Sequence, residues 1–236
     1  MRFSILAASF DGVPPDDIAV SGGLAETIVE HNISCAAIRR SESGVSSLAL
    51  MSVVEQKLGS LGLKYSCAGS IEPRPDRPGG CVMLAQLPIL GTVSDGGAGA
   101  RLAVSPDVSV DVYSLRADDL PARDVPDFVD RSVRGFQAQW RTDRSTRKRG
   151  RPFTHSGRPG PDTRIICVAA HFVAAGDREL DDAMVAAGFY PAVFGADVPD
   201  RIYLKPAIGP TGQRALAIPV GDGTRPLYAA LVEFEV

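Results

Sequence analysis

The sequence lacks any apolar run long enough to cross a bilayer, and its first apolar segment ends before Asp11. A membrane helix needs about 20 consecutive apolar residues, and this first segment is also too short for a signal peptide. The cysteines, Cys35, Cys67, Cys81 and Cys167, have no metal-ligand spacing, and most lie in apolar runs, where a thiol behaves as a small hydrophobe. We therefore expect reduced cysteines, a cytoplasmic location, no membrane partner and no bound metal or other cofactor.

Lysine is scarce and positive charge is not in excess. Lys and Arg together number 25 against 28 Asp and Glu, which gives a formal net charge of −3. Nucleic-acid binding depends on concentrated positive charge that displaces counterions. Nucleic acid is therefore a possible partner but not a favoured one. The abundance of arginine and alanine over lysine indicates a GC-rich bacterial genome.

The composition is that of one globular domain, because 44% of the 236 residues are hydrophobic and 22% are charged. The periodicity predicts an alternation of strands and helices across residues 1–236. Strands are expected at residues 3–8, 33–38, 80–89, 100–104, 108–115, 163–170, 201–205, 214–219 and 227–235. Helices are expected after Ser21, over residues 46–61, from Pro126 onward and over residues 178–187.

One segment is of low complexity. Residues 141–161 are rich in Arg, Pro, Gly and Ser and contain almost no hydrophobic side chains. Such a composition predicts a mobile loop. Its basic run could also be a nucleic-acid patch, but only Trp140 and Phe153 flank it, so a solvated loop is the favoured interpretation.

Four segments carry a resemblance to a known family. Residues 165–173 read Ile-Ile-Cys-Val-Ala-Ala-His-Phe-Val, residues 200–204 read Asp-Arg-Ile-Tyr-Leu, and residues 222–227 read Asp-Gly-Thr-Arg-Pro-Leu. They resemble the strand that ends in Gly-Asp-Phe-Asn, the Arg-Ile-Asp-Tyr-Ile strand and the Ser-Asp-His-Arg-Pro-Val segment of the endonuclease/exonuclease/phosphatase (DNase-like) superfamily. Residues 80–89 resemble that family's Gly-Val-Ala-Ile-Leu-Ser-Arg-x-Pro-Ile segment. The resemblance implies an α+β (α/β) four-layer sandwich, in which two packed mixed β-sheets are flanked by helices.

The resemblance also implies where the family's catalytic residues fall. Members hydrolyse phosphoesters with a divalent cation, which prefers carboxylate oxygens, and with a His that activates water. Carried over one by one, the site positions fall on Ser9, Arg40, Ser114 (or Tyr113 if the register slips by one), His171, Tyr203 and Thr224, with Asp222 one residue from a lost Asp. By this alignment every metal-binding carboxylate is absent.

These substitutions predict a family member without metal-dependent phosphoesterase activity. In this interpretation His171, Tyr113 and Ser114 are the candidate catalytic groups. The candidate ligand-binding residues are Ser9, Arg40, Tyr203, Asp222 and Thr224. Strand alternation is taken to direct Arg40 into the pocket and Arg39 into solvent. We expect the cleft to bind a small polar or anionic molecule, with metal-free acid/base chemistry in bacterial specialised metabolism. The alternative is a non-catalytic pseudo-nuclease that holds nucleic acid or a partner protein through the basic loop.

Overall fold

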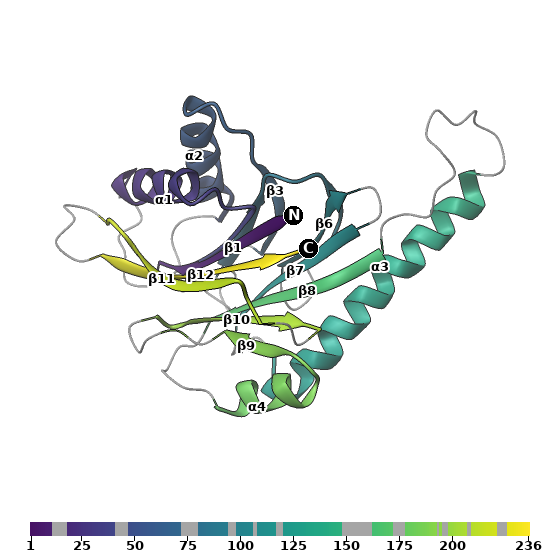
Figure 1. Ribbon diagram of the computed structural model, residues 1–236. Helices are drawn as coiled ribbons and strands as arrows, with labels where there is room; N and C mark the ends of the chain where they lie inside the picture. Colours follow the sequence, from purple (N-terminus) through teal and green to yellow (C-terminus); the bar gives the residue numbers. More distant parts are fainter. Residues whose placement is uncertain are drawn as a thin grey trace.

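Two six-stranded mixed sheets form the centre of the molecule (Figure 1). The computed structural model describes residues 1–10, 18–40, 47–71, 80–93, 98–105, 108–116, 120–147, 162–171, 178–192, 194, 198–206, 209–220 and 226–236. The first sheet has the order β11 (Gly212–Ile218), β12 (Leu227–Glu235), β1 (Arg2–Ser9), β2 (Cys35–Arg40), β4 (Gly80–Ala85) and β3 (Ser66–Ile71). The second sheet has the order β5 (Ile89–Val93), β6 (Ala98–Ser105), β7 (Val108–Arg116), β8 (Asp162–His171), β10 (Asp200–Lys205) and β9 (Tyr190–Ala192).

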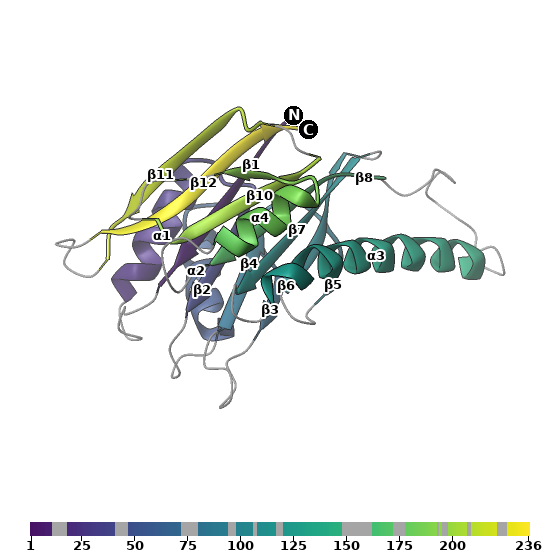
Figure 2. The ribbon, with the colours of Figure 1, turned by 90° about the horizontal axis from the view of Figure 1, so that it is seen from below.

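Helices cover the outer face of each sheet. Helices α1 (Ile18–Glu30) and α2 (Ser47–Ser60) bury Leu24, Ile28, Val54 and Leu58 against the first sheet. The 3-10 helix η1 (Ala122–Asp124) and helices α3 (Val125–Arg147) and α4 (Arg178–Ala186) cover the second sheet. Figure 2 shows these helix pairs on opposite sides of the two sheets. The predicted four-layer sandwich is therefore confirmed.

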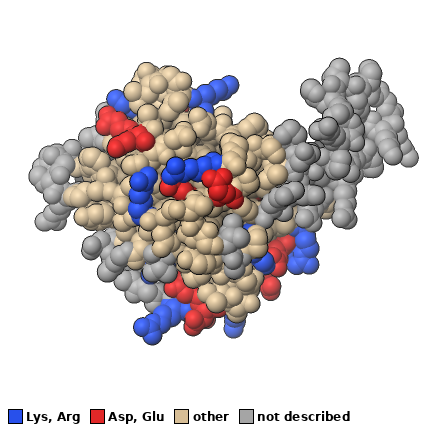
Figure 3. Space-filling model, viewed as in Figure 1, with Lys and Arg blue, Asp and Glu red and all other residues tan. Residues whose placement is uncertain are grey.

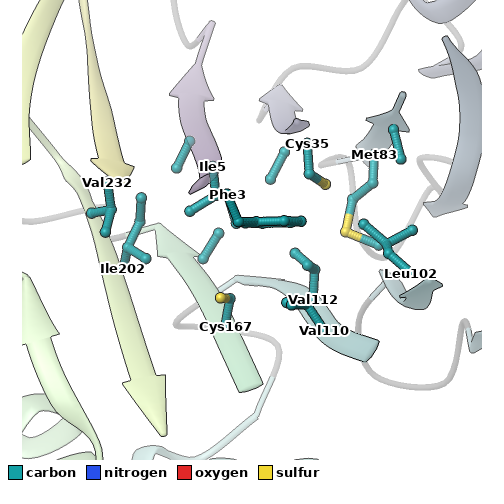
Figure 4. Close-up of a cluster of buried hydrophobic side chains, with 14 of the residues drawn as sticks. Phe3, Ile5, Cys35, Met83, Leu102, Val110, Val112, Cys167, Ile202 and Val232 are labelled. Carbon is teal, nitrogen blue, oxygen red and sulfur yellow. The ribbon is translucent and has the colours of Figure 1, made fainter. Parts of the chain in front are cut away.

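The main core lies between the sheets. Alternate residues of each strand point inward, because successive side chains of a strand leave on opposite faces. On β1 the inward residues are Phe3, Ile5 and Ala7, and they meet inward residues of β7 and β8 such as Val112 and Cys167 (Figure 4). Each of these side chains is buried, so this layer holds the two sheets at a fixed distance and fixes where their strand ends meet.

Two sequence predictions need correction. Residues 80–89 were expected to form one strand, but the chain leaves the first sheet after Ala85 and enters the second at Ile89. Pro88 lies at this crossing. Its nitrogen carries no hydrogen, so it cannot donate a hydrogen bond to a neighbouring strand, whereas its carbonyl oxygen accepts one from the Ala103 amide (2.9 Å). The loop predicted from residue 141 is helical as far as Arg147, because α3 continues to that point. Residues 148–161 lie outside the described part of the chain.

Helix α3 extends well past the sheets, as both views show (Figures 1 and 2). Its first half packs on the second sheet through Val125, Phe128 and Val129. No helix in the described ranges is both long enough and apolar enough to span a bilayer. On the face drawn in Figure 3, the described acidic and basic side chains are interspersed and no single-sign patch dominates.

Candidate strand-end polar site

The candidate site begins with a hydrogen bond that joins the two sheets. Ser9 ends β1 on the inward face, two residues after the core residue Ala7. Asp200 begins β10 on its inward face, two residues before the core residue Ile202. The Ser9 hydroxyl donates to Asp200 Oδ1 at 2.8 Å, and the two residues are only 4% and 2% exposed. A polar contact thus closes the end of the apolar layer between the sheets.

Arg39 lies beside this pair. Strands β1 and β2 are parallel, and Ser9 is in register with Arg39. Cys35 and Ala37 belong to the inter-sheet core, so the two-residue period places Arg39 on the same inward face. Arg39 is 3% exposed, and the prediction that it meets solvent is wrong. The backbone of Arg40 belongs to β2, but its side chain lies outside the described part.

Ser114 adds a second hydroxyl from the other sheet. It follows Val110 and Val112 on the inward face of β7 and is 1% exposed. Cys81, which is in register with Arg39, has its sulfur 4.0 Å from the Ser114 carbonyl oxygen. The Ser114 hydroxyl has no hydrogen-bond partner within the described chain. We call Ser9, Arg39, Ser114 and Asp200 the strand-end cluster.

The two tyrosines expected at the site lie on the opposite face of the second sheet. Tyr113 packs edge-on against Phe128 of α3, with ring centroids 6.2 Å apart and an interplanar angle of 80°. Tyr203 donates its hydroxyl hydrogen to Asp181 Oδ1 of α4 at 2.6 Å. Both residues belong to the core beneath the helices, so assigning them to the cleft is wrong. Burial raises the pKa of Tyr113 well above its ordinary value, and the neighbouring Asp111 adds to the rise.

The remaining candidates are placed only in part. His171 ends β8, where its backbone is in register with Asp200 of β10. Its side chain lies outside the described part, as do all atoms of Asp222 and Thr224. Of the residues that the sequence analysis proposed, the structure brings Ser9 and Ser114 into the strand-end cluster.

Arg39 and Asp200 are the residues that the motif alignment missed. The alignment placed the family's carboxylate on Tyr203, but the carboxyl group that meets Ser9 belongs to Asp200. The site therefore contains one carboxyl group, at a position that the alignment did not supply. Alternation with Ile202 and Leu204, both inward core residues, was a signal in the sequence that could have identified Asp200.

The cluster combines one guanidinium, one carboxyl group and two hydroxyls. Arginine is charged at any accessible pH, and a hard divalent cation prefers several oxygen ligands. Among the described residues no group of three or more His, Cys, Asp or Glu side chains is placed to hold a metal ion. Nucleophilic cysteine chemistry is also disfavoured nearby, because burial raises the pKa of Cys35 to about 12 and that of Cys167 well above its usual value.

Comparison with known proteins places the fold. No family model matches the sequence, and no curated protein is similar to it. Solved structures match over the whole chain. An endonuclease/exonuclease/phosphatase from Bacteroides vulgatus gives a TM-score of 0.64 at 8% identity and covers 100% of this chain and 99% of its own. A family protein from Leptotrichia buccalis gives 0.60 at 8% identity, covering 99% and 100%.

A third similar structure is TDP2 from D. rerio, complexed with a single-strand DNA product. It gives a TM-score of 0.55 at 12% identity and covers 100% of this chain and 99% of its own. At such identities the likeness concerns the fold. The chain therefore has the fold of the endonuclease/exonuclease/phosphatase superfamily, as the four sequence motifs predict.

Proposed function

We propose that this chain, which has the endonuclease/exonuclease/phosphatase fold, uses its strand-end cluster to bind a small polar or anionic molecule without a metal ion. It is not a metal-dependent nuclease or phosphatase. The observation that carries the proposal is the burial of Arg39 on the inward face, beside Ser9 and in register with Cys81.

The charge of Arg39 argues against a divalent cation at this place. A guanidinium cannot lose its proton under working conditions, so it repels a cation directly. Asp200 is the one carboxyl group that the described cluster contains, and it offsets a single positive charge. A site with nearly balanced charge suits a neutral polar molecule or a single anionic group, which arginine holds through a fork of two N–H donors.

The Ser114 hydroxyl supports a ligand of this kind. It is 1% exposed and has no partner within the described chain. A buried hydroxyl is costly unless it forms a hydrogen bond, and an oxygen or nitrogen of a bound molecule would provide one.

We retain His171 as the candidate base for a metal-free proton transfer, because its backbone lies beside Asp200. Cytoplasmic location and a role in bacterial specialised metabolism remain part of the proposal, and the four free cysteines support a reducing compartment.

Metal dependence is tested first. Purified protein is incubated with supercoiled plasmid and with p-nitrophenyl phosphate at millimolar Mg²⁺ or Mn²⁺, with EDTA as the reference. We expect no metal-stimulated cleavage of either substrate. Cleavage that co-purifies with the protein and is lost in Asp200→Asn would overturn the proposal.

Ligand binding is tested separately by thermal shift with inorganic phosphate, acetate and malonate. A compound that raises the midpoint temperature of unfolding of the wild type should raise that of Arg39→Gln by less, because the variant lacks the bidentate donor. Arg131→Gln is the matched control, since Arg131 is an exposed arginine of α3. His171→Ala should keep the shift. If a compound shifts the midpoint of the Arg39 and Arg131 variants equally, Arg39 does not bind it.

A second candidate function is the binding of nucleic acid or a partner protein by the basic segment. The observation that favours it is the length of α3, which gives positions 141, 144 and 147 a helical framework beyond the sheets. The test is fluorescence anisotropy with a labelled single-stranded oligonucleotide at several salt concentrations. Changing Arg141, Arg144 and Arg147 to Glu should weaken binding far more than the equal charge change at Arg123, Arg131 and Arg178. Equal losses would indicate non-specific attraction only.

A further inference from the structure

A second polar group is buried on the outer face of the second sheet. Arg101 of β6 and Asp111 of β7 are in register with each other. Their contact is bidentate, with Nε to Oδ1 and Nη2 to Oδ2 both at 2.7 Å. Arg101 is 1% exposed and Asp111 is fully buried. Because the neighbouring residues Ala100 and Leu102 point into the inter-sheet core, this ion pair lies on the opposite face, away from the strand-end cluster.

Two hydroxyls flank the ion pair. Ser109 and Tyr113 are two residues before and after Asp111, so all three leave the same face of β7. Both are fully buried, and neither hydroxyl has a hydrogen-bond partner within the described chain. On β6, Ala103 is in register with Ser109 and Gly99 with Tyr113, and neither residue has a side chain that can form a hydrogen bond. On β8, Val168 is in register with Tyr113 and Thr163 with Ser109, and the Thr163 side chain lies outside the described part.

We propose that ordered water molecules lie beside the Arg101–Asp111 pair and join the Ser109 and Tyr113 hydroxyls to it. Buried water is found where two to four polar groups converge and direct partners are missing. Each oxygen of a carboxylate can accept more than one hydrogen bond. We call this group the β6–β7 hydrated site.

The hydrated site also affects the candidate functional site. Tyr113 and Ser114 are adjacent in β7, and their side chains leave on opposite faces. A network that fixes Tyr113 therefore fixes the position of β7 where it presents Ser114 to the strand-end cluster. The hydrated site is nevertheless independent of the proposed ligand, because it rests on residues of the other face.

The test compares three Tyr→Phe substitutions, each of which removes a single oxygen. Tyr113→Phe removes the hydroxyl that we expect to bind water. Tyr65→Phe removes a hydroxyl that donates directly to the Ile33 carbonyl at 2.5 Å. Tyr228→Phe removes an exposed hydroxyl. The ratio of folded to unfolded protein should fall by about 2- to 10-fold for Tyr113→Phe and for Tyr65→Phe, and it should hardly change for Tyr228→Phe. Ser109→Ala should behave like Tyr113→Phe.

The opposite sign would overturn the proposal. A buried hydroxyl without any partner destabilises the folded state, so its removal would raise the folded-to-unfolded ratio. A second measurement uses the wild type alone and does not depend on the variants folding. Long-lived internal water should give water-to-amide cross-relaxation in NMR at the backbone amides of residues 109–113. Absence of that signal would equally contradict the proposal.

Discussion

The hydrogen bond between Ser9 and Asp200 gives a direct prediction about the strand-end cluster. It joins residues 191 positions apart at a distance of 2.8 Å in a buried place. A hydrogen bond to a charged partner contributes about 1.5–3 kcal/mol. We therefore expect Ser9→Ala to lower the free energy of unfolding by about 2 kcal/mol. Asp200→Asn should lower it by a similar amount, because it also removes the negative charge near Arg39.

A double-mutant cycle separates the bond from other effects of the two changes. If the two side chains interact directly, the double variant should lose less than the sum of the single losses, by about 1–2 kcal/mol. Urea denaturation is the assay. With a slope of about 2.5 kcal/mol per molar urea, a loss of 2 kcal/mol lowers the midpoint by about 0.8 M.

The matched control is Ser132→Ala, which removes a hydroxyl that donates to the Phe128 carbonyl of α3 at 3.0 Å. Combined with Asp200→Asn, it should be additive within about 0.3–0.5 kcal/mol. A Ser9–Asp200 coupling no larger than this would refute the inter-sheet contact and the cluster that depends on it.

Two further predictions concern buried groups elsewhere. Arg101→Met leaves Asp111 buried without its bidentate partner, so it should lower the free energy of unfolding by about 3–5 kcal/mol. Adding Asp111→Leu to this variant should recover part of the lost stability. A double variant no more stable than Arg101→Met would contradict this account. Alkaline pH should destabilise the protein, because burial raises the pKa of Cys35 from 9.0 to about 12 and that of Tyr65 from 10.0 to about 12. Above pH 9 the unfolded chain releases these protons before the folded chain does, so stability falls, by about 1.4 kcal/mol at pH 10 for Cys35 alone. Cys35→Ala should show a smaller fall between pH 8 and pH 10, as urea denaturation at the two pH values will reveal.

The sequence predicted the architecture better than it predicted the site. Long apolar runs and their order were enough to place most strands and helices and the four-layer sandwich. The edge strands β3, β5 and β9 were missed because they lack a clear two-residue alternation, and β5 and β9 are also short. The extension of α3 to Arg147 was missed because the polar residues 141–147 suggested a loop, although a helix that has already formed is extended at little cost and three of these seven residues are arginine, a good helix former.

The site was harder to predict because a shift of one residue changes the face of a strand. Arg40 was placed inward on a motif alignment, whereas the alternation of Cys35 and Ala37 places Arg39 there. On β10 the alignment put a site residue at Tyr203, which lies on the outward face, whereas Asp200 lies on the inward face beside Ser9. The apolar residues that alternate with Arg39 and Asp200 indicated the inward face of each strand, but the motif alignment was followed instead.

The position of β1 between β2 and β12 has a consequence for folding. β1 pairs in parallel with β2 early in the chain, but its other edge is completed only by antiparallel pairing with β12. Contacts of such large sequence separation slow folding, because a long loop must close before they form. During synthesis the backbone N–H and C=O groups of β1 that pair with β12 stay unpaired until β12 has left the ribosome. The same late step aligns the central strand that ends in Ser9, so nascent chains are expected to need protection from aggregation until the first sheet is complete.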